Sequence, residues 1–378
     1  METIQLSPVV LEWAAAQAGY SLDELANKLS KKAPEKILDG ILTNAQVIKF
    51  AKTTGTTLGY LFLDEPPSPR KLPVADFRTT IDPTPLSKDF FDTFDDIEFK
   101  QSWYRDYLMS NGVKPHQFVK KYQNTKIDIS ILAQEICAEL DFKHEDRMSI
   151  RNAEELYSLL VNRCERIGIL VFKNGVVGNN TSKHLSVSEF RGFALADEVA
   201  PTIFINGADA PAAWVFTLAH ELAHIWKGNS GVSDASPISE NQEERFCNAV
   251  AAEILVPTIQ FKIQWDSAQS ENALEKIDQT RRVFKVSNLV IARKALDLGY
   301  ITYTTYNQIY NLAKQKKQTS SGGDFYATLA VRNSKLFSKQ VSNLAISGAI
   351  TLGQAGRLLN TNPNNVVKFY AKQNTVSV

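Results

Sequence analysis

Hydrophobic residues recur three and four positions apart over residues 1–65, a spacing typical of amphipathic helices. The pattern predicts helices at 8–19, at 21–29, after Pro34 and at 43–53. Ser21 and Glu24 predict a capping box at the start of the second helix, in which each side chain bonds a backbone amide that the helix leaves free. The proline-rich stretch 61–70 (LFLDEPPSPR) predicts a boundary, so we expect a helical domain over residues 1–65.

The periodicity changes twice in the rest of the chain. Extended character at 76–81 is followed by helical spacing at 87–123, 127–140 and 152–166, and then by strand-like segments at 167–172, 189–194 and 202–206. Helices are predicted again at 212–226, 240–255 and 333–347, with a helix–turn–helix pattern at 273–300. This order predicts an α+β fold, mostly helical, with a small sheet. We expect a main domain over 72–310 with its core at 167–300, a connector at 314–324, and an accessory helical subdomain over 324–378.

The strongest chemical signal is the segment 216–226, FTLAHELAHIW, which contains an HExxH pattern. His220 and His224 are four residues apart, so on a helix both lie on one face and can bind one metal ion. Zinc suits imidazole ligands and lowers the pKa of a bound water, whose proton Glu221 can then accept. The pattern predicts a zincin-like peptidase. The alternative is a buried helix with two hydrogen-bonded histidines.

A zinc peptidase needs a third protein ligand, and the segment 240–257 (ENQEERFCNAVAAEILVP) offers candidates. Its acidic residues are Glu240, Glu243, Glu244 and Glu253. Glu244 is the preferred ligand, and Asn248, four residues further, shares its face and can orient a histidine. Glu243 and Glu240 remain alternatives, and an acidic first turn in solvent would also suit the helix dipole.

A candidate substrate-binding strand lies just before the HExxH segment. In zincins an edge strand beside the site helix pairs with an extended substrate backbone. The candidate strand consists of Ile203, Phe204, Ile205 and Asn206. The alternative is that this strand is internal to the sheet.

Composition narrows the class of protein. The chain has 42 Lys+Arg against 41 Asp+Glu, a net charge of +1, which argues against a strongly basic nucleic-acid coat protein. Its three cysteines are far apart and odd in number, which disfavours a disulfide framework and suits a reducing cytoplasm. No apolar run approaches the ~18 residues of a membrane span, and residues 1–11 lack a secretory-signal pattern. We therefore expect a cytoplasmic protein with no membrane partner.

Several neighbouring segments together resemble the ImmA/IrrE metallopeptidases over about residues 167–300. They are the HExxH segment, the strands RGFAL and PTIFIN before it, and ERFCNAVAAEILVP after it. The stretch 72–80 (LPVADFRTT) is also similar to a segment of the longer members. The resemblance implies a gluzincin-like site in which His220, His224 and Glu244 bind Zn²⁺, Glu221 is the general base, and Asn248 matches a polar residue one turn after the Glu ligand.

The same resemblance implies a regulatory role. Members act in the bacterial or phage cytoplasm and cleave a partner repressor of the helix-turn-helix type, while others occur in toxin–antitoxin-like pairs. We therefore expect a zinc-dependent endopeptidase that cuts a regulatory protein. The alternative is an antitoxin-like or regulatory binding protein that uses the zincin fold as a scaffold, with or without DNA binding.

Residues 9–31 (VVLEWAAAQAGYSLDELANKLSK) resemble the start of Cro/repressor-like helix-turn-helix domains. The expected recognition segment, 33–40, is interrupted by Pro34 and Gly40, and residues 1–65 hold six Lys and no Arg against eight Asp+Glu. Because DNA binding depends on neutralising phosphates, DNA is a possible partner but a protein-interaction or dimerisation module is favoured. The more basic segment 273–300 is better explained as a solvated face over an apolar core than as a nucleic-acid contact.

Overall fold

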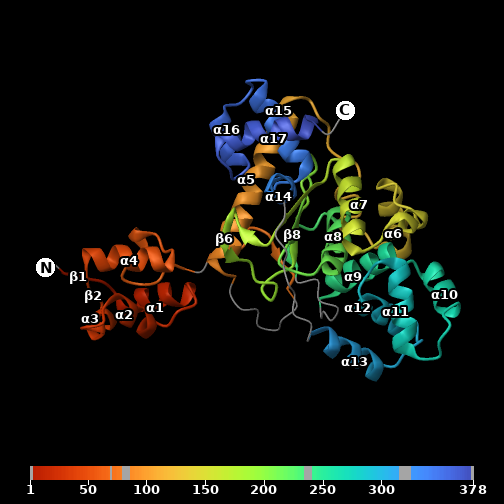
Figure 1. Ribbon diagram of the computed structural model, residues 1–378, viewed down its shortest axis with the longest axis horizontal. Helices are drawn as coiled ribbons and strands as arrows, with labels where there is room; N and C mark the ends of the chain where they lie inside the picture. The colour runs from red at the N-terminus through yellow and green to blue at the C-terminus, as the bar shows by residue number, and fades with distance from the viewer. Residues whose placement is uncertain (1–2, 69, 79–85, 234–240, 315–324, 376–378) are drawn as a thin grey trace. The chain divides into compact units, whose positions relative to one another are not determined.

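The computed structural model describes residues 3–68, 70–78, 86–233, 241–314 and 325–375. The chain forms two compact units, residues 1–73 (unit 1) and residues 74–378 (unit 2) (Figure 1). The helical segment 325–375 belongs to unit 2. Parts of two predicted segments, residues 79–81 of the extended stretch and residues 315–324 of the connector, lie outside the described residues.

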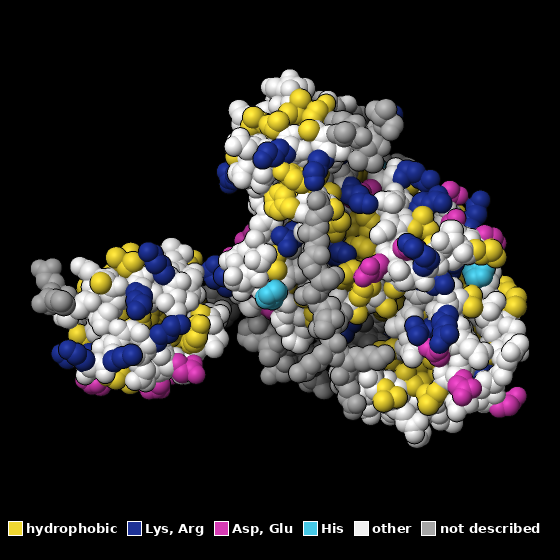
Figure 2. Space-filling view, viewed as in Figure 1, with side chains coloured by type: hydrophobic (Ala, Val, Ile, Leu, Met, Phe, Trp, Pro, Cys, Tyr) yellow, Lys and Arg dark blue, Asp and Glu magenta, His cyan; other side chains and the backbone are white. Residues whose placement is uncertain are grey.

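Unit 1 is a small helical unit that carries a two-stranded antiparallel sheet. Its elements are β1 (Thr3–Gln5), α1 (Pro8–Gln17), α2 (Leu22–Leu29), α3 (Pro34–Leu38), β2 (Ile41–Thr43), α4 (Asn44–Thr54) and the 3-10 helix η1 (Leu58–Phe62). The predicted capping box is present: Glu24 N donates to Ser21 Oγ at 3.1 Å and Ser21 N to Glu24 Oε2 at 2.9 Å. On the face in Figure 2, the basic side chains of unit 1 are spread out and its acidic side chains gather along the lower edge.

Most of unit 2 is helical, and this confirms the expected α+β class. Its helices are α5 (Lys88–Ser110), α6 (Ile129–Glu139), η2 (His144–Ser149), α7 (Ala153–Arg166), α8 (Pro211–Lys227), α9 (Gln242–Leu255), α10 (Thr258–Asp266), α11 (Ala273–Phe284), α12 (Asn288–Asp297), α13 (Tyr303–Lys314), α14 (Phe325–Arg332), α15 (Lys335–Ile346), α16 (Leu352–Leu358) and α17 (Pro363–Thr375). The helix expected over 87–123 ends at Ser110, because Gly112 adopts φ +72° and Pro115 has no amide proton to continue it.

A five-stranded mixed sheet lies in unit 2 with the order β3-β9-β7-β8-β4. The strands are β3 (Ala75–Asp76), β4 (Leu170–Asn174), β7 (Gly192–Leu195), β8 (Thr202–Asn206) and β9 (Gly231–Ser233). β7 runs antiparallel to both β8 and β9, whereas β4 is parallel to β8 and β3 is parallel to β9. A separate hairpin joins β5 (Val176–Val177) to β6 (Asn180–His184).

The expectation that Ile203, Phe204, Ile205 and Asn206 form a substrate-binding edge is wrong. Their strand, β8, is hydrogen-bonded to β7 on one side and β4 on the other, and every residue of it is buried. The Phe204 ring stacks on Phe193 of β7 with centroids 5.0 Å apart. With both backbone edges in use, β8 cannot accept a further strand.

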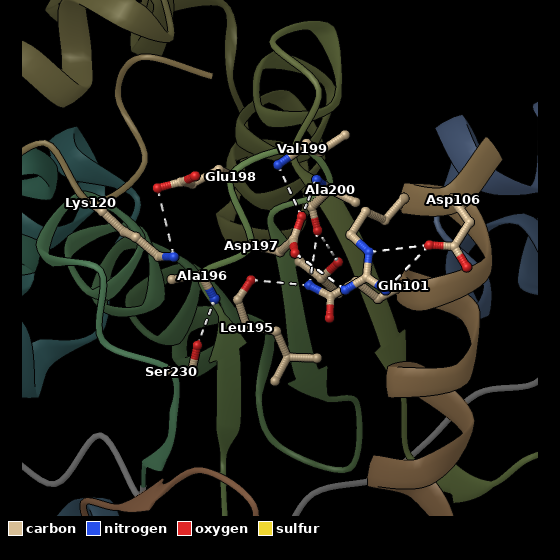
Figure 3. A network of polar contacts seen from close by, with 12 residues as sticks. Gln101, Asp106, Lys120, Leu195, Ala196, Asp197, Glu198, Val199, Ala200 and Ser230 are labelled. Atoms are coloured by element: carbon tan, nitrogen blue, oxygen red, sulfur yellow. Dashed lines mark hydrogen bonds and ion pairs between the residues drawn. The ribbon is translucent and has the colours of Figure 1, made fainter. Parts of the chain in front are cut away.

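The connection between β7 and β8 is held by a polar network (Figure 3). Gln101 on α5 donates to the carbonyls of Leu195 and Ala200 at 3.2 and 2.9 Å, which fixes both ends of the connection. Ala196 N donates to Ser230 Oγ at 2.9 Å, which ties the end of β7 to the residue before β9. These bonds fix the start of β9 relative to the sheet.

Helix α8 lies in the centre of unit 2, in contact with β7, β8, α6, α7 and α9. The α8 side chain Trp226 is fully buried, stacks on Phe118 at 4.6 Å and donates its indole N–H to Glu135 on α6. Among the described residues no single helix is long and apolar enough to cross a membrane; α9 and α10 pass that test only as a pair bent by 57°.

Candidate metal centre

Helix α8 places the HExxH residues in the interior of unit 2. It begins with Pro211 in its first turn, where the missing amide proton costs nothing, and Gly228 ends it at φ +73°. His220 and Glu221 are fully buried and His224 is 1% exposed. Polar side chains this deeply buried need partners, which come from α9 and β9.

Helix α9 supplies the acidic partner. Asn241 caps its start, its side-chain oxygen accepting from the amides of Glu243 and Glu244 at 2.9 and 3.4 Å. The Glu244 carboxylate reaches α8 with Oε2 3.2 Å from His220 Nε2 and Oε1 2.9 Å from His224 Nε2. The two Nε2 atoms lie 3.0 Å apart. The structure therefore brings His220, His224 and Glu244 together, one ligand atom from each lying within 4.8 Å of the others.

The other acidic candidates of this segment lie elsewhere. Glu243 accepts a hydrogen bond from Asn229 Nδ2 at 2.8 Å. Glu253 forms an ion pair with Lys294 and accepts from Thr258 N at 2.9 Å. Glu240 lies outside the described residues.

The three convergent groups fit a metal ion. Two imidazole nitrogens and a carboxylate are a typical catalytic zinc donor set, and a tetrahedral ion with bonds of 2.0–2.1 Å separates its ligands by about 3.3 Å. The observed separations of 2.9–3.2 Å are close to that value. A buried carboxylate facing two imidazole nitrogens needs positive charge among them, which either a proton or a metal ion can provide.

The pKa shifts of the site residues also fit a metal-binding cluster with a general base beside it. Burial opposes ionisation of Glu244, but hydrogen bonds and charge from His220 and His224 lower the pKa of its carboxyl to about 2. Burial likewise opposes protonation of His220, yet the Glu244 carboxylate outweighs it and raises the pKa of the imidazole. Burial raises the pKa of Glu221. A general base benefits from such a raised pKa, because its proton affinity then approaches that required near neutral pH.

Glu221 is positioned by β9 rather than by the other site residues. The Ser233 hydroxyl donates a hydrogen bond to Glu221 Oε1. Among the described residues, Glu221 Oε2 is buried with no hydrogen-bond partner. One oxygen is thus held by the protein and the other is left to accept a proton.

Gly192 on β7 lets α8 approach the sheet closely enough to make this arrangement. A Cβ at position 192 would lie 2.7 Å from Thr217 Cγ2, 2.8 Å from Phe204 O and 3.1 Å from Glu221 Oε1. Only a residue without a side chain fits between β8 and the face of α8 that carries Thr217 and Glu221.

Two residues of α9 contact the far side of the histidine rings. Cys247 Sγ lies 3.7 Å from His224 Nδ1. Asn248, the orienting residue expected from the sequence, interacts with His220, and its side chain contributes to the raised pKa of that imidazole. Contacts of this kind fix the ring orientation and direct the Nε2 atoms toward a shared ligand.

Sequence reasoning missed several residues that shape this centre, namely Phe77, Gly192, Ser233 and Cys247. Of these four, only Cys247 could have been found from the sequence, because its spacing places it on the same helical turn as Glu244 and Asn248. The ring of Phe77, the residue after β3, stacks on His224, and Ser233 ends β9. The pairing of these short strands depends on the tertiary fold, and no local spacing reveals it.

The comparisons with known proteins add one positive finding. Residues 164–296 match the metallopeptidase family of IrrE N-terminal-like domains. This domain contains α8, α9, β4, β7, β8 and β9, and therefore all of His220, Glu221, His224 and Glu244. Residues 1–163 and 297–378 lie outside the match. No curated protein and no solved structure matches the chain.

The match of residues 164–296 to a metallopeptidase family agrees with the donor set that the structure brings together. The family implies a bound metal, commonly zinc, and the His–His–Glu cluster is where such an ion could be held.

Proposed function

We propose that the protein is a zinc-dependent endopeptidase whose metal is held by His220, His224 and Glu244, with Glu221 as the general base. The observation that carries the proposal is the convergence of three buried ligand atoms within 4.8 Å of one another, with the buried carboxylate of Glu221 beside them. The family match at 164–296 supports the same reaction class.

Each residue has a distinct part in the proposed reaction. A zinc ion held by these three residues would supply Lewis acidity to a peptide carbonyl and to a water molecule. Glu221 takes the proton from that water through Oε2 and later passes it to the nitrogen of the departing amine. Ser233 holds Oε1, so the carboxylate cannot rotate away between these steps. Cys247 and Asn248 keep the histidine rings turned toward the metal.

We further propose that the substrate is a regulatory protein, such as a helix-turn-helix repressor encoded nearby. Support for this comes from the resemblance of the core to the ImmA/IrrE peptidases and from the presence of a separate unit 1 that can recognise a partner. Helix α3 of unit 1 has only five residues, which is little for a helix that reads a DNA groove. Protein recognition is therefore the favoured role of unit 1.

A second candidate function is a binding protein that retains the metal as a structural element. It is favoured by one observation: none of His220, Glu221, His224 and Glu244 is more than 1% exposed. Such a protein would hold a co-encoded partner, in the manner of an antitoxin, without cutting it.

The two functions are separated by Glu221→Gln. The full chain and the variant are loaded with zinc and incubated with purified repressor-like proteins encoded beside the gene, and the products are identified by intact mass. An endopeptidase gives fragments with the wild type, and the variant, with unchanged zinc content, cuts at least about a hundredfold more slowly. A stable complex that stays uncut with both chains would support the binding protein instead.

The third ligand is tested with a matched pair on α9. Glu244→Gln removes the proposed ligand, whereas Glu243→Gln removes a neighbouring carboxylate that bonds only Asn229 among the described residues. We expect about one zinc per chain in the wild type and in Glu243→Gln, and a large loss in Glu244→Gln. Equal zinc content in both variants would contradict the assignment.

A further inference from the structure

The outer edge of β9 is occupied by the chain's own residues 74–78, here named the strap. Ala75 and Asp76 form β3, which runs parallel to β9 in register with Gly231 and Val232. Ala75 N donates to Ser230 O at 3.2 Å and Phe77 N to Val232 O at 2.9 Å. The strap thus forms the last strand of the sheet on the side of the metal centre.

Phe77 of the strap covers a proposed metal ligand. Its ring stacks on His224 with centroids 5.1 Å apart and an interplanar angle of 14°. The ring also lies against β9, since a Cβ at Gly231 would be 2.2 Å from Phe77 Cε2. Position 231 therefore has to be glycine for the ring to reach His224.

β9 is the strand best placed to receive a substrate. It carries Ser233, which bonds Glu221, and its other edge is paired with β7. An extended peptide adds to a free strand edge, and β8, the strand expected from the sequence, has none. Without the strap, β9 would be the edge strand beside the metal centre.

We propose that the strap occupies the place of the substrate backbone and closes the metal centre, and that a protein substrate enters by displacing it. The substrate would then be an extended segment that pairs with β9 and presents an aromatic or large apolar side chain where Phe77 lies. This inference rests on the proposed peptidase function, and it adds both a substrate edge and a form of self-inhibition.

The backbone pairing that holds the strap to β9 is short, although the side chain of Arg78 is largely buried. The strap is paired over two residues only; Ala75 and Asp76 are exposed and Phe77 is half-buried. Asp76 binds Arg78 of the strap itself, with Asp76 Oδ2 2.7 Å from the guanidinium. Short, exposed pairings of this kind open locally without unfolding the domain. β9 is more firmly held, through its pairing with β7 and the bond from Ala196 to Ser230.

Exchange of zinc tests the strap directly. Zinc uptake by the metal-free full chain, and zinc release to an excess of a chromogenic chelator, are timed for the wild type, Phe77→Ala and Phe99→Ala. Phe99 is a matched control because it is 42% exposed on α5, where Arg357 packs over its ring. If the strap is a gate, Phe77→Ala takes up and releases zinc faster by the same factor, about tenfold or more, with little change in affinity. Phe99→Ala exchanges zinc as the wild type does.

The comparison of uptake with release excludes a merely structural role. If the Phe77 ring only braces His224, its loss speeds release without speeding uptake, and the proposal is overturned. Rates equal to those of the wild type in both directions overturn it too. Gly231→Ala is a second variant with the same expected result, because its methyl group displaces the ring while Phe77 remains in the chain.

Binding of a peptide in trans tests the substrate edge. A synthetic peptide with the sequence of residues 72–78 should bind zinc-loaded Phe77→Ala more tightly than the wild type, and a peptide with Ala at the Phe77 position should bind at least about tenfold more weakly. Equal binding of both peptides would contradict the proposed place for an aromatic side chain. A wild-type chain that takes up no zinc would refute the peptidase function itself. Zinc uptake by the wild type, with the same exchange rates in Phe77→Ala, would refute only the proposal that the strap closes the metal centre.

Discussion

Gly192 is the position where the smallest change should disturb the metal centre most. In Gly192→Ala the new methyl carbon would lie 2.7 Å from Thr217 Cγ2 and 2.8 Å from the carbonyl oxygen of Phe204. Carbon atoms in contact prefer 3.5–4.0 Å, and the carbonyl is part of a strand that pairs on both sides and cannot retreat. Helix α8 therefore has to move away from the sheet by roughly 0.5–1 Å, and Glu221 moves with it.

The magnitude follows from that displacement. Overpacking of a dense core costs about 1–3 kcal/mol, which in a domain of this size lowers the melting temperature by about 2–8 °C. A shift approaching 1 Å in the general base should reduce cleavage by about tenfold to a hundredfold. The zinc content should fall less than the cleavage rate, because His220 and His224 move together on α8 and only their distance to Glu244 on α9 changes.

Gly353→Ala is the matched control for this change. Gly353 lies in α16, and a Cβ there would meet nothing closer than Thr351 Oγ1 at 3.9 Å. Alanine in a helix is favoured over glycine, so this variant should be stabilised by about 0.5 kcal/mol and cleave normally. Calorimetry and the repressor-cleavage assay, run on both variants, provide the comparison. A Gly192→Ala protein as stable and as active as Gly353→Ala would refute the close-packing argument.

Three further predictions concern other parts of the chain. Arg147 is 4% exposed and donates hydrogen bonds to the carbonyls of Ile254 and Leu255 at the end of α9. Arg147→Met should therefore lower the free energy of unfolding by about 2–3 kcal/mol and weaken zinc binding. Urea unfolding identical to that of the wild type would contradict this. Burial lowers the pKa of Lys173 to about 8 from its ordinary 10.5, although the Trp214 ring 3.5 Å away favours the charged form. The unfolded chain then binds more protons between about pH 8 and 10.5. The stability of the wild type relative to Lys173→Met should therefore rise by about 2–3 kcal/mol from pH 7 to pH 10, and a flat difference would disprove the shift. Ser21→Ala should remove the capping box and destabilise unit 1 by about 1 kcal/mol, visible as faster amide exchange in α2 but not in unit 2.

Local patterns in the sequence were sufficient for most of the fold. Strand 202–206 and the helices near 212–226 and 240–255 were predicted nearly as they occur, because their apolar residues recur at the period of the element that they form. His220 and His224 were likewise candidates from their spacing, whereas Glu244 was one of several acidic candidates on the next helix and was favoured over Glu243 and Glu240 by the family resemblance.

What could not be predicted depends on contacts between distant segments. Nothing in the sequence of 202–206 distinguishes an edge strand from an internal one, because a buried strand has the same apolar run in either position. β3 and β9 have two and three residues, too few for a periodic signal, yet they bring Phe77 and Ser233 to the centre. The role of Gly192 appears only once Thr217 and Glu221 are seen to face it across the sheet.

Zinc content of the purified full chain, compared with that of His224→Ala and Glu244→Ala, tests the central claim most directly. The site geometry predicts about one zinc per wild-type chain and nearly complete loss in both variants, with the fold retained by circular dichroism. Glu243→Gln should keep its zinc, because that side chain bonds Asn229 instead. A wild-type chain that binds no zinc after purification with the metal present, or a Glu244→Ala variant that binds zinc as tightly as the wild type, would contradict the account.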